Sequence, residues 1–276
     1  MKVWLDAGLL DADDARVSVF DHGLTVGDGV FETAKVVDGL PFALTRHLDR
    51  LARSAAGLGL AAPAEADLRA AVAATLEANA AELGAPHRLR ITLTGGTGPL
   101  GSDRGDAGPT LLVALAPLRI WPATAKVVVV PWTRNERGAT AGLKTTSYAE
   151  NVVALAFAHA AGGSEAVLAN TVGQLCEGTG SNVFLVLDGE MVTPPLSSGC
   201  LAGVSRALVL EWTDAIERDL SMADLARAEE VFLTSSTRDV QAVHAVDDHE
   251  LPGAPGPMTA QVAAAFAERA AADVDP

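Results

Sequence analysis

The chain has 276 residues, of which 49% are hydrophobic, and it carries a formal net charge of −15 at pH 7. This length exceeds that of a usual single core, so two domains or one large α/β domain are expected. The negative charge disfavours binding to nucleic acid and to anionic membranes, so any anionic ligand must be held by a few local donors.

Signals for targeting are missing from the sequence. No apolar run reaches the length of a membrane span, and the first six residues include an acid without a small-residue cleavage site. The two cysteines, Cys176 and Cys200, lie far apart and form no CxxC pair. We therefore expect a cytoplasmic protein with buried, reduced thiols and without a metal site.

The first part of the chain is predicted to form short strands. Runs of β-branched and aromatic residues indicate strands at residues 2–6, 17–20, 29–37 and 40–44, with a turn at Asp38-Gly39 before the last. In the third strand, alternation places Phe31, Thr33 and Lys35 on one face. Phe31 is then either a core residue or part of a pocket wall.

Helices and a glycine-rich loop follow these strands. Leucines at helical spacing predict an amphipathic helix over residues 45–58, with Arg50 near the border of its apolar stripe, and a second helix is predicted over 64–83. Residues 88–94 and 110–116 indicate buried strands. The glycine cluster between them lacks the Gly-Lys-Ser/Thr ending of a nucleotide P-loop, so a mobile loop is predicted there.

Two prolines divide the chain near its middle. Pro117 and Pro122 predict a link at residues 118–125, between an N-terminal domain at 1–117 and a C-terminal domain at 126–276. In the second domain the pattern predicts strands and helices at 126–130, 152–161, 165–169, 174–177, 182–187, 203–212, 230–234 and 258–271.

Lys144 lies just before the apolar run at residues 152–158, which predicts a buried helix. Lysine is rarely buried unless it is paired, and in a partly apolar pocket its depressed pKa makes the amine a usable nucleophile and base. Such an amine forms Schiff bases with carbonyl compounds, of which pyridoxal phosphate is the common case. Taken alone, Lys144 is interpreted more simply as a surface lysine just before a helix.

Three further groups could hold a phosphorylated pyridine aldehyde together with Lys144. Glu177 lies between a strand and a glycine turn, Val204 and Ser205 open a helix, and residues 235–237 carry three hydroxyls. The free amides of a helix N-terminus can bind phosphate. Taken singly, Glu177 could be a solvated turn acid and Ser205 an ordinary N-cap.

Over nearly its full length the chain resembles the fold-type IV pyridoxal-phosphate enzymes, the class IV aminotransferases. The blocks that carry this resemblance are residues 27–32, 47–51, 142–144, 177–184, 203–206 and 230–237. The family includes branched-chain, D-amino acid and (R)-amine transaminases and aminodeoxychorismate lyase. The resemblance implies an α/β (α+β) protein with the two-domain fold of the D-amino acid aminotransferases, the cofactor lying between the domains.

The resemblance also implies a role for each residue of the constellation. Lys144 would carry the cofactor and move the proton between the substrate Cα and the cofactor C4′, and Glu177 would pair with the pyridine nitrogen. Arg50 would anchor the phosphate, with Ser236, the Ser205 hydroxyl and the amides of Val204 and Ser205 completing its site. A homodimer with active sites at the subunit interface, an amino donor and a 2-oxo acid acceptor are implied as well.

The substrate pocket departs from the D-amino acid transaminases. Their Arg-x-His carboxylate trap aligns with Leu100 and Ser102, and their pocket tyrosine aligns with Phe31. Other donors must then hold the substrate carboxylate. The candidate pocket residues are His22, Arg104, Arg134, Arg137, Thr237 and Arg238.

The subclass is inferred from the residues after the lysine. Residues 144–148, Lys-Thr-Thr-Ser-Tyr, resemble the transaminases more than the aminodeoxychorismate lyases, which carry His-Leu-Asn after the lysine. Branched-chain transaminases have a tyrosine-rich pocket, whereas this chain has only Tyr148. We therefore predict a transaminase for D-amino acids, with (R)-amines as further donors. The alternatives are an aminodeoxychorismate lyase and a branched-chain L-amino acid transaminase.

Overall fold

The computed structural model describes residues 1–276, and the chain packs into two compact units. The first unit comprises Met1–Arg119, Leu143–Tyr148 and Val274–Pro276, and the second comprises Ile120–Gly142 and Ala149–Asp273. The change of unit after Arg119 falls inside the predicted link at 118–125. Lys144, which the predicted boundaries assign to the C-terminal domain, packs with the first unit.

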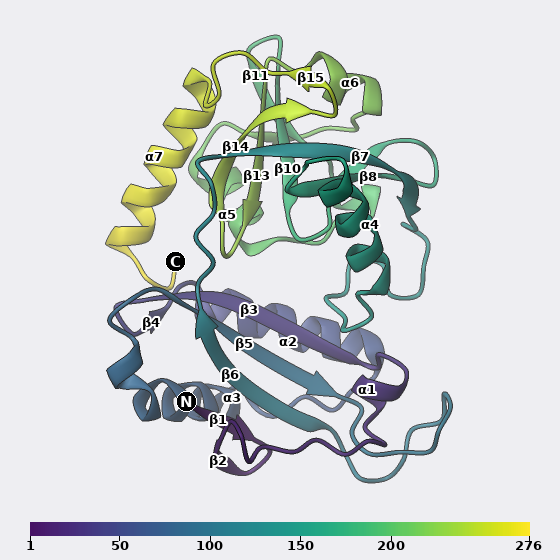
Figure 1. Ribbon diagram of the computed structural model, residues 1–276, viewed down its shortest axis with the longest axis vertical. Helices are drawn as coiled ribbons and strands as arrows, with labels where there is room; N and C mark the ends of the chain where they lie inside the picture. Colours follow the sequence, from purple (N-terminus) through teal and green to yellow (C-terminus); the bar gives the residue numbers. More distant parts are fainter. The chain divides into compact units, whose positions relative to one another are not determined.

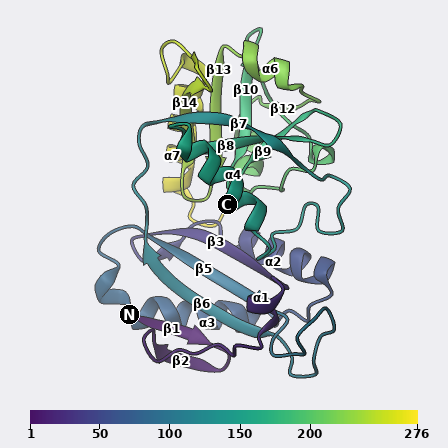
Figure 2. The same cartoon turned by 45° about the vertical axis from the view of Figure 1, so that its right-hand side comes forward.

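The first unit is built on a six-stranded antiparallel sheet with the strand order β2-β1-β6-β5-β3-β4 (Figures 1 and 2). Its elements, in chain order, are β1 Lys2–Leu5, β2 Gly8–Asp11, α1 His22–Thr25, β3 Gly29–Val37, β4 Leu40–Pro41, α2 Leu44–Leu58, α3 Glu65–Ala78, a 3₁₀ turn at Ala80–Glu82, β5 His87–Thr94 and β6 Thr110–Pro117.

The helices α2 and α3 share one core with the sheet. Alternate residues of β5 are buried, beginning with His87, and Leu89, Ile91 and Leu93 pack with leucines of α2 and α3. The remaining residues of β5 therefore lie on the other face of the sheet. That face is the one on which the sequence places Phe31.

The N-terminus of α2 is completed by the last residues of the chain. Ala43, the N-cap residue, makes no side-chain cap, and its backbone N–H donates to the Val274 carbonyl at 2.7 Å. The Thr45 N–H donates to the Asp275 carboxylate at 2.8 Å, and Arg46 Nε donates to the Pro276 carbonyl at 2.7 Å. The residues 274–276 thus replace the missing cap of this helix.

Two predicted strands of the first unit are wrong. Residues 17–20 form no strand, because Val17, Val19 and Phe20 are exposed and have no neighbouring strand to pair with. The strand predicted at 40–44 ends at Pro41, and Leu44 already begins α2. High β-propensity is not sufficient where no partner strand and no buried face are available.

The second unit contains a nine-stranded mixed sheet with the order β12-β11-β10-β13-β14-β7-β8-β9, to which β15 adds beside β14 (Figure 1). Its elements are β7 Thr124–Arg134, α4 Ala149–Ala160, β8 Glu165–Asn170, β9 Leu175–Gly178, β10 Asn182–Leu187, β11 Glu190–Thr193, a 3₁₀ turn at Leu196–Ser198, α5 Val204–Trp212, β12 Ile216–Glu217, α6 Met222–Arg227, β13 Glu230–Ser235, β14 Asp239–Val246, β15 His249–Glu250 and α7 Pro257–Ala272.

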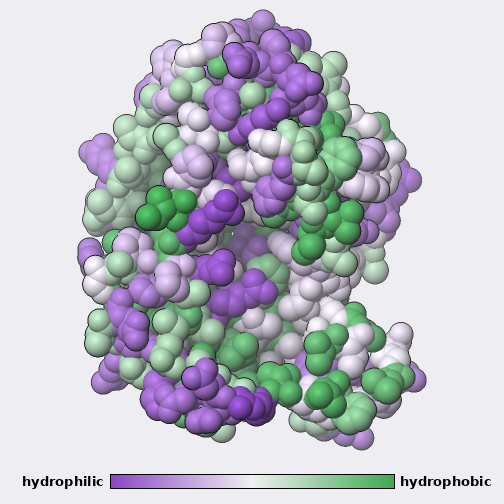
Figure 3. Space-filling model, in the orientation of Figure 1, coloured by the Kyte–Doolittle hydropathy of each residue, from purple (hydrophilic) through white to green (hydrophobic).

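The helix α4 corrects a further prediction, since it is not a buried helix. Only Asn151, Ala154 and Ala158 are buried, whereas Val152 and Phe157 are exposed. The exposed side chains form a hydrophobic surface over α4 in Figure 3. The run is apolar on both faces, but only its alanine side packs on β7 and β8.

Both cysteines are buried and free, as the sequence predicts. Burial raises the pKa of the Cys200 thiol to about 11 and raises that of Cys176 further, so neither thiol is a ready nucleophile. Among the helices, none combines the length and the apolar character needed to cross a membrane.

Candidate active site

The backbone around Lys144 forms an added edge on the start of β3. The Phe31 N–H donates to the Lys144 carbonyl at 3.0 Å, and the Thr146 N–H donates to the Gly29 carbonyl at 2.8 Å. The Lys144 N–H donates to Ser54 Oγ of α2 at 3.1 Å. These main-chain bonds fix the position of Lys144 whatever its side chain does.

The Lys144 amine lies among aromatic groups. Its Nζ is 4.4 Å from the centre of the Phe31 ring and 3.5 Å from the Tyr148 hydroxyl. The Phe31 and Tyr148 rings meet edge to face, with their centres 5.1 Å apart. Ring faces stabilise a cation electrostatically but cannot accept its proton. The half-buried amine thus lies against two aromatic rings, with the Tyr148 hydroxyl within reach of its Nζ.

A buried ionic cluster lies behind this face, between β3 and α2. Arg50 donates from Nε and Nη2 to the two carboxylate oxygens of Glu32, each at 2.7 Å, and His47 Nδ1 lies 2.6 Å from Glu32 Oε2. Burial alone raises the pKa of Glu32, but the Arg50 charge and hydrogen bonds outweigh burial and hold this pKa far below its usual value. Burial also lowers the pKa of His47.

Glu32 consequently fixes the orientation of Arg50. A bidentate pair with the carboxylate leaves the planar guanidinium little freedom to rotate. The sequence predicts Arg50 as a phosphate anchor, and this role stays a prediction. The structure adds that a phosphate at Arg50 would meet a guanidinium whose charge is already largely balanced by Glu32.

In the second unit, Glu177 belongs to β9 and is buried. Its Oε2 accepts a hydrogen bond from the Leu201 N–H at 2.9 Å, and its Oε1 lies 3.1 Å from Arg134 Nε. The predicted carboxylate is thus held in a defined orientation by a backbone amide and a guanidinium, and it is not a solvated turn acid.

Unpartnered hydroxyls of the same unit lie near the start of α5, which packs against β13. Gly203 is the N-cap of α5 and provides no side-chain cap, and a Cβ at this position would collide with Asn182 Oδ1. Ser205 is buried at the second position of this helix. The Thr234 and Ser235 hydroxyls are buried without a hydrogen-bond partner. Such orphaned donors at a helix N-terminus are suited to a phosphate.

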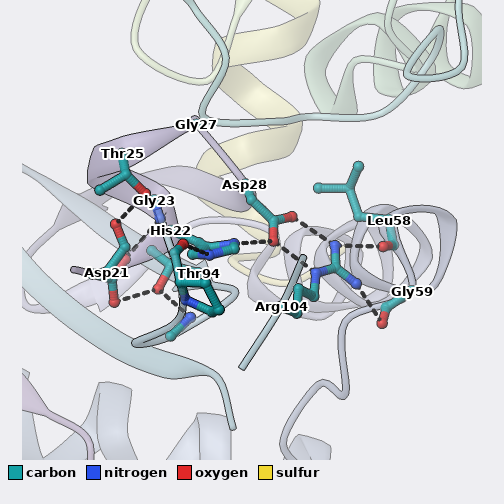
Figure 4. A network of polar contacts seen from close by, with 12 residues as sticks. Asp21, His22, Gly23, Thr25, Gly27, Asp28, Leu58, Gly59, Thr94 and Arg104 are labelled. Carbon is teal, nitrogen blue, oxygen red and sulfur yellow. Dashed lines mark hydrogen bonds and ion pairs between the residues drawn. The ribbon is translucent and has the colours of Figure 1, made fainter. Parts of the chain in front are cut away.

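His22 and Arg104, two predicted pocket residues, belong to a polar network in the first unit (Figure 4). Arg104 donates from Nε and Nη2 to Asp28 at 2.7 and 2.6 Å, and to the carbonyls of Leu58 and Gly59 at the end of α2. His22 is buried, with Nε2 2.9 Å from the Pro99 carbonyl and Nδ1 3.6 Å from Asp28.

This network attaches the glycine-rich loop to the start of β3. The Arg104 hydrogen bond holds the pKa of Asp28 below its usual value, although burial acts in the opposite direction. A Cβ at Gly95 would collide with the Asp28 carboxylate, so the loop passes directly over it. The loop has no helix or strand, as predicted, but both of its ends are tied down, while Leu100 at its tip is exposed.

Loss of Arg104 is expected to loosen this loop. Arg104→Met removes the bonds to Asp28 and to the end of α2, so amide hydrogen exchange of residues 95–109 should quicken by about tenfold. Mass-spectrometric exchange on the purified protein measures this change. Arg53→Met, at an exposed arginine of α2, is the matched control. Unchanged protection in Arg104→Met would contradict a tethering role.

The other predicted pocket residues are dispersed. Arg134 is paired with Glu177, and Arg238 is paired with the buried Glu165 at 3.1 Å while its guanidinium lies over the Trp121 ring. Arg137 is exposed beside Glu136. Thr237 and Ser236 lie in the half-buried turn after β13. Apart from Arg137, the predicted arginines thus already have carboxylate partners in the protein interior or in the loop network.

Four residues near the lysine were missed by the sequence reasoning, namely Glu32, His47, Arg90 and Tyr148. The strand pattern over 88–94 contains the signal for Arg90, because a charged residue inside a buried strand is unusual. Tyr148 is the single tyrosine and follows the lysine by four residues. Arg90 comes to lie beside Phe31 only through the register of β5 against β3, which pairs Thr33 with Arg90.

Comparison with known proteins agrees with this geometry. Residues 29–246 match the family model for amino-transferase class IV. A protein of Methanocaldococcus jannaschii that carries a provisional name as a branched-chain-amino-acid aminotransferase is 34% identical over 90% of this chain and 88% of its own. The D-alanine aminotransferase of Bacillus licheniformis is 30% identical over 96% of both chains.

A solved structure extends the match to three dimensions. The PLP-bound form of a hypothetical aminotransferase from Mycobacterium tuberculosis superimposes with a TM-score of 0.88 at 26% identity, covering 100% of both chains. The family model includes β3, β5, Lys144, Glu177 and the start of α5 within its matched residues. The chain therefore belongs to the class IV aminotransferase family.

Proposed function

We propose that this aminotransferase moves an amino group from a D-amino acid to a 2-oxo acid. The observation that carries the proposal is the Lys144 amine, fixed by main-chain bonds on β3 and surrounded by Phe31 and Tyr148. Class IV aminotransferases work with pyridoxal 5'-phosphate, and this enzyme uses the same cofactor.

The residues present fit this cofactor. An amine, a buried carboxylate held by an amide, and a group of unpartnered hydroxyls at an uncapped helix are the partners that an aldehyde, a pyridine nitrogen and a phosphate require. The cofactor supplies, when bound, an electron-withdrawing ring that makes the substrate Cα proton acidic. Residues of the chain carry out the proton transfers and hold the cofactor in place.

Each residue then has a distinct task. With the cofactor bound, Lys144 Nζ would move the proton between the substrate Cα and the cofactor C4′, first as a general base and then as a general acid. Glu177 keeps a proton on the pyridine nitrogen, because a carboxylate stabilises the adjacent positive charge. Ser205 and the amides of Val204 and Ser205 hold the phosphate, and Arg50 contributes a second anchor.

The preference for D-amino acids is supported by two features. The D-alanine aminotransferase of Bacillus licheniformis aligns with almost the entire chain. The chain also lacks the additional tyrosines of a branched-chain pocket, since Tyr148 is its only tyrosine. The Methanocaldococcus relative, which is 34% identical, favours branched-chain L-amino acids as the second candidate substrates.

A donor panel tests the proposal. The cofactor-loaded protein is incubated with 2-oxoglutarate and, separately, D-alanine, L-leucine, L-valine or (R)-1-phenylethylamine, and chiral chromatography follows the glutamate formed. With D-glutamate as donor, pyruvate replaces 2-oxoglutarate as the acceptor. We expect the D-amino acids to be the better donors. Faster reaction of L-leucine or L-valine would establish the branched-chain alternative instead. Release of 4-aminobenzoate and pyruvate from aminodeoxychorismate, without amino transfer from any donor, would overturn the transaminase itself.

A further inference from the structure

Arg90 lies on the sheet face that carries Phe31, opposite the face covered by α2 and α3. It is the fourth residue of β5, and its neighbours Leu89 and Ile91 are fully buried in the core on the other side. The centre of its guanidinium, Cζ, is 3.3 Å from the centre of the Phe31 ring. Its Nε donates to Thr92 Oγ1 at 3.2 Å.

Arg90 has no carboxylate partner in the chain, although it is half-buried. Arg50, Arg104, Arg134 and Arg238 all pair with acids. Burial lowers the pKa of Arg90 to about 10, although the charge of Glu32 on the other face of the sheet acts in the opposite direction, so Arg90 stays protonated at neutral pH. A partly desolvated cation without a partner is unfavourable, and an anion bound beside it would remove that penalty.

The position of Arg90 relative to Lys144 suits a particular anion. Arg90 Cζ and Lys144 Nζ approach the same ring, at 3.3 and 4.4 Å from its centre. In an α-amino acid a single carbon separates the amino nitrogen from the carboxylate. A guanidinium binds a carboxylate through two parallel hydrogen bonds of about 2.7–2.9 Å. A substrate whose nitrogen is at the Lys144 end can therefore extend its carboxylate toward Arg90.

We propose that Arg90 binds the α-carboxylate of the amino-acid substrate and so selects amino acids over amines that lack a carboxylate. This inference rests on the proposed transaminase function and assigns one residue of its substrate site. It also accounts for the missing Arg-x-His trap, since Leu100 and Ser102 offer no cation. Phe31 supports the guanidinium by stacking and provides no competing acceptor.

Replacement of Arg90 tests the inference with three variants. Arg90→Leu should lower kcat/KM for D-alanine and D-glutamate by about 100-fold, mainly through KM, because a charged hydrogen-bonded partner is lost. For (R)-1-phenylethylamine, kcat/KM should change less than about threefold. Arg90→Lys should restore part of the loss as a point charge. Arg88→Leu, at an exposed arginine on the same strand face, is the matched control.

A binding measurement accompanies the kinetics. The dissociation constant of 4-methylpentanoate, a carboxylate that cannot accept an amino group, is obtained from absorption titration of the cofactor-loaded protein. It should rise by a similar factor in Arg90→Leu and stay unchanged in Arg88→Leu. Cofactor content should be equal in all variants, because the proposal places Arg90 at the substrate carboxylate and not at the cofactor.

The possible failures are separable. A wild-type protein that transfers no amino group from any amino acid would disprove the proposed function. A wild-type transaminase whose Arg90→Leu variant keeps its KM and its affinity for 4-methylpentanoate would disprove the inference alone. A loss confined to D-glutamate would assign Arg90 to the side-chain carboxylate and overturn the α-carboxylate role.

Discussion

Lys144→Ala is expected to lower amino transfer by at least about 1,000-fold. By the proposed assignment, the variant loses both the nucleophile and the base that moves the substrate proton, and proton transfer alone contributes about 10²–10⁴-fold. Stability should change little, because Lys144 is held by main-chain hydrogen bonds that alanine keeps. Single-turnover kinetics with D-alanine and a thermal unfolding curve measure the two effects.

Borohydride reduction identifies the reactive lysine independently of turnover. Treated wild-type protein should gain the mass of the reduced cofactor on the peptide that contains Lys144, and Lys144→Ala should gain none. Lys35→Ala, which removes a lysine of β3, serves as the control. Label on a different lysine, or undiminished turnover in Lys144→Ala, would mean that the wrong amine was assigned.

Glu32→Leu is expected to destabilise the protein by about 3–5 kcal/mol, because it leaves Arg50 buried without its carboxylate. Denaturation in urea, with cofactor-free protein to remove the effect of ligand binding, measures the loss. Glu65→Gln breaks an exposed pair with Arg69 and should cost no more than about 1 kcal/mol. A Glu32→Leu variant as stable as the wild type would show that the cluster contributes nothing to folding.

The same cluster predicts the pH dependence of stability. The pKa of Glu32 is lower in the folded protein than its ordinary value of 4.5, so its contribution is present above that value and is lost as the pH falls below it. The folded pKa of His47 is below its ordinary value of 6.5, so protonation of the unfolded chain weakens folding below that pH. Both effects act in one direction, and acid unfolding should begin at a higher pH than in a protein without this cluster.

The regular strands were the most predictable part of the fold. The predicted strand at 29–37 and the one at 182–187 coincide with β3 and β10, because alternating or continuous apolar residues end at glycine turns. The strand β14, at Asp239–Val246, was missed even though it alternates in part. Its first residues continue a polar turn, and its parallel pairing with β7 joins segments far apart in the sequence.

The candidate site was predictable where its residues lie in local motifs. Lys144, Glu177 and Ser205 each stand at a recognisable junction between a turn and a regular element. Arg90 belongs to no local motif. Its place beside the Phe31 ring arises only when β5 pairs with β3 in this register. The pairing of Arg104 with Asp28 is equally a product of folding, because the two residues are separated by 76 positions.

The cap that residues 274–276 provide for α2 restricts how this protein can be manipulated. An affinity tag or fusion partner joined after Pro276 would act on the carboxyl-terminal strap that holds the first amides of the helix bearing Arg50. Trimming this strap would let that helix fray at its beginning and would disturb the orientation of the buried Arg50 guanidinium, which lies within the first two turns. Attachment before Met1 avoids this, since β1 begins at Lys2 and is separated from β3 in the sheet by β6 and β5.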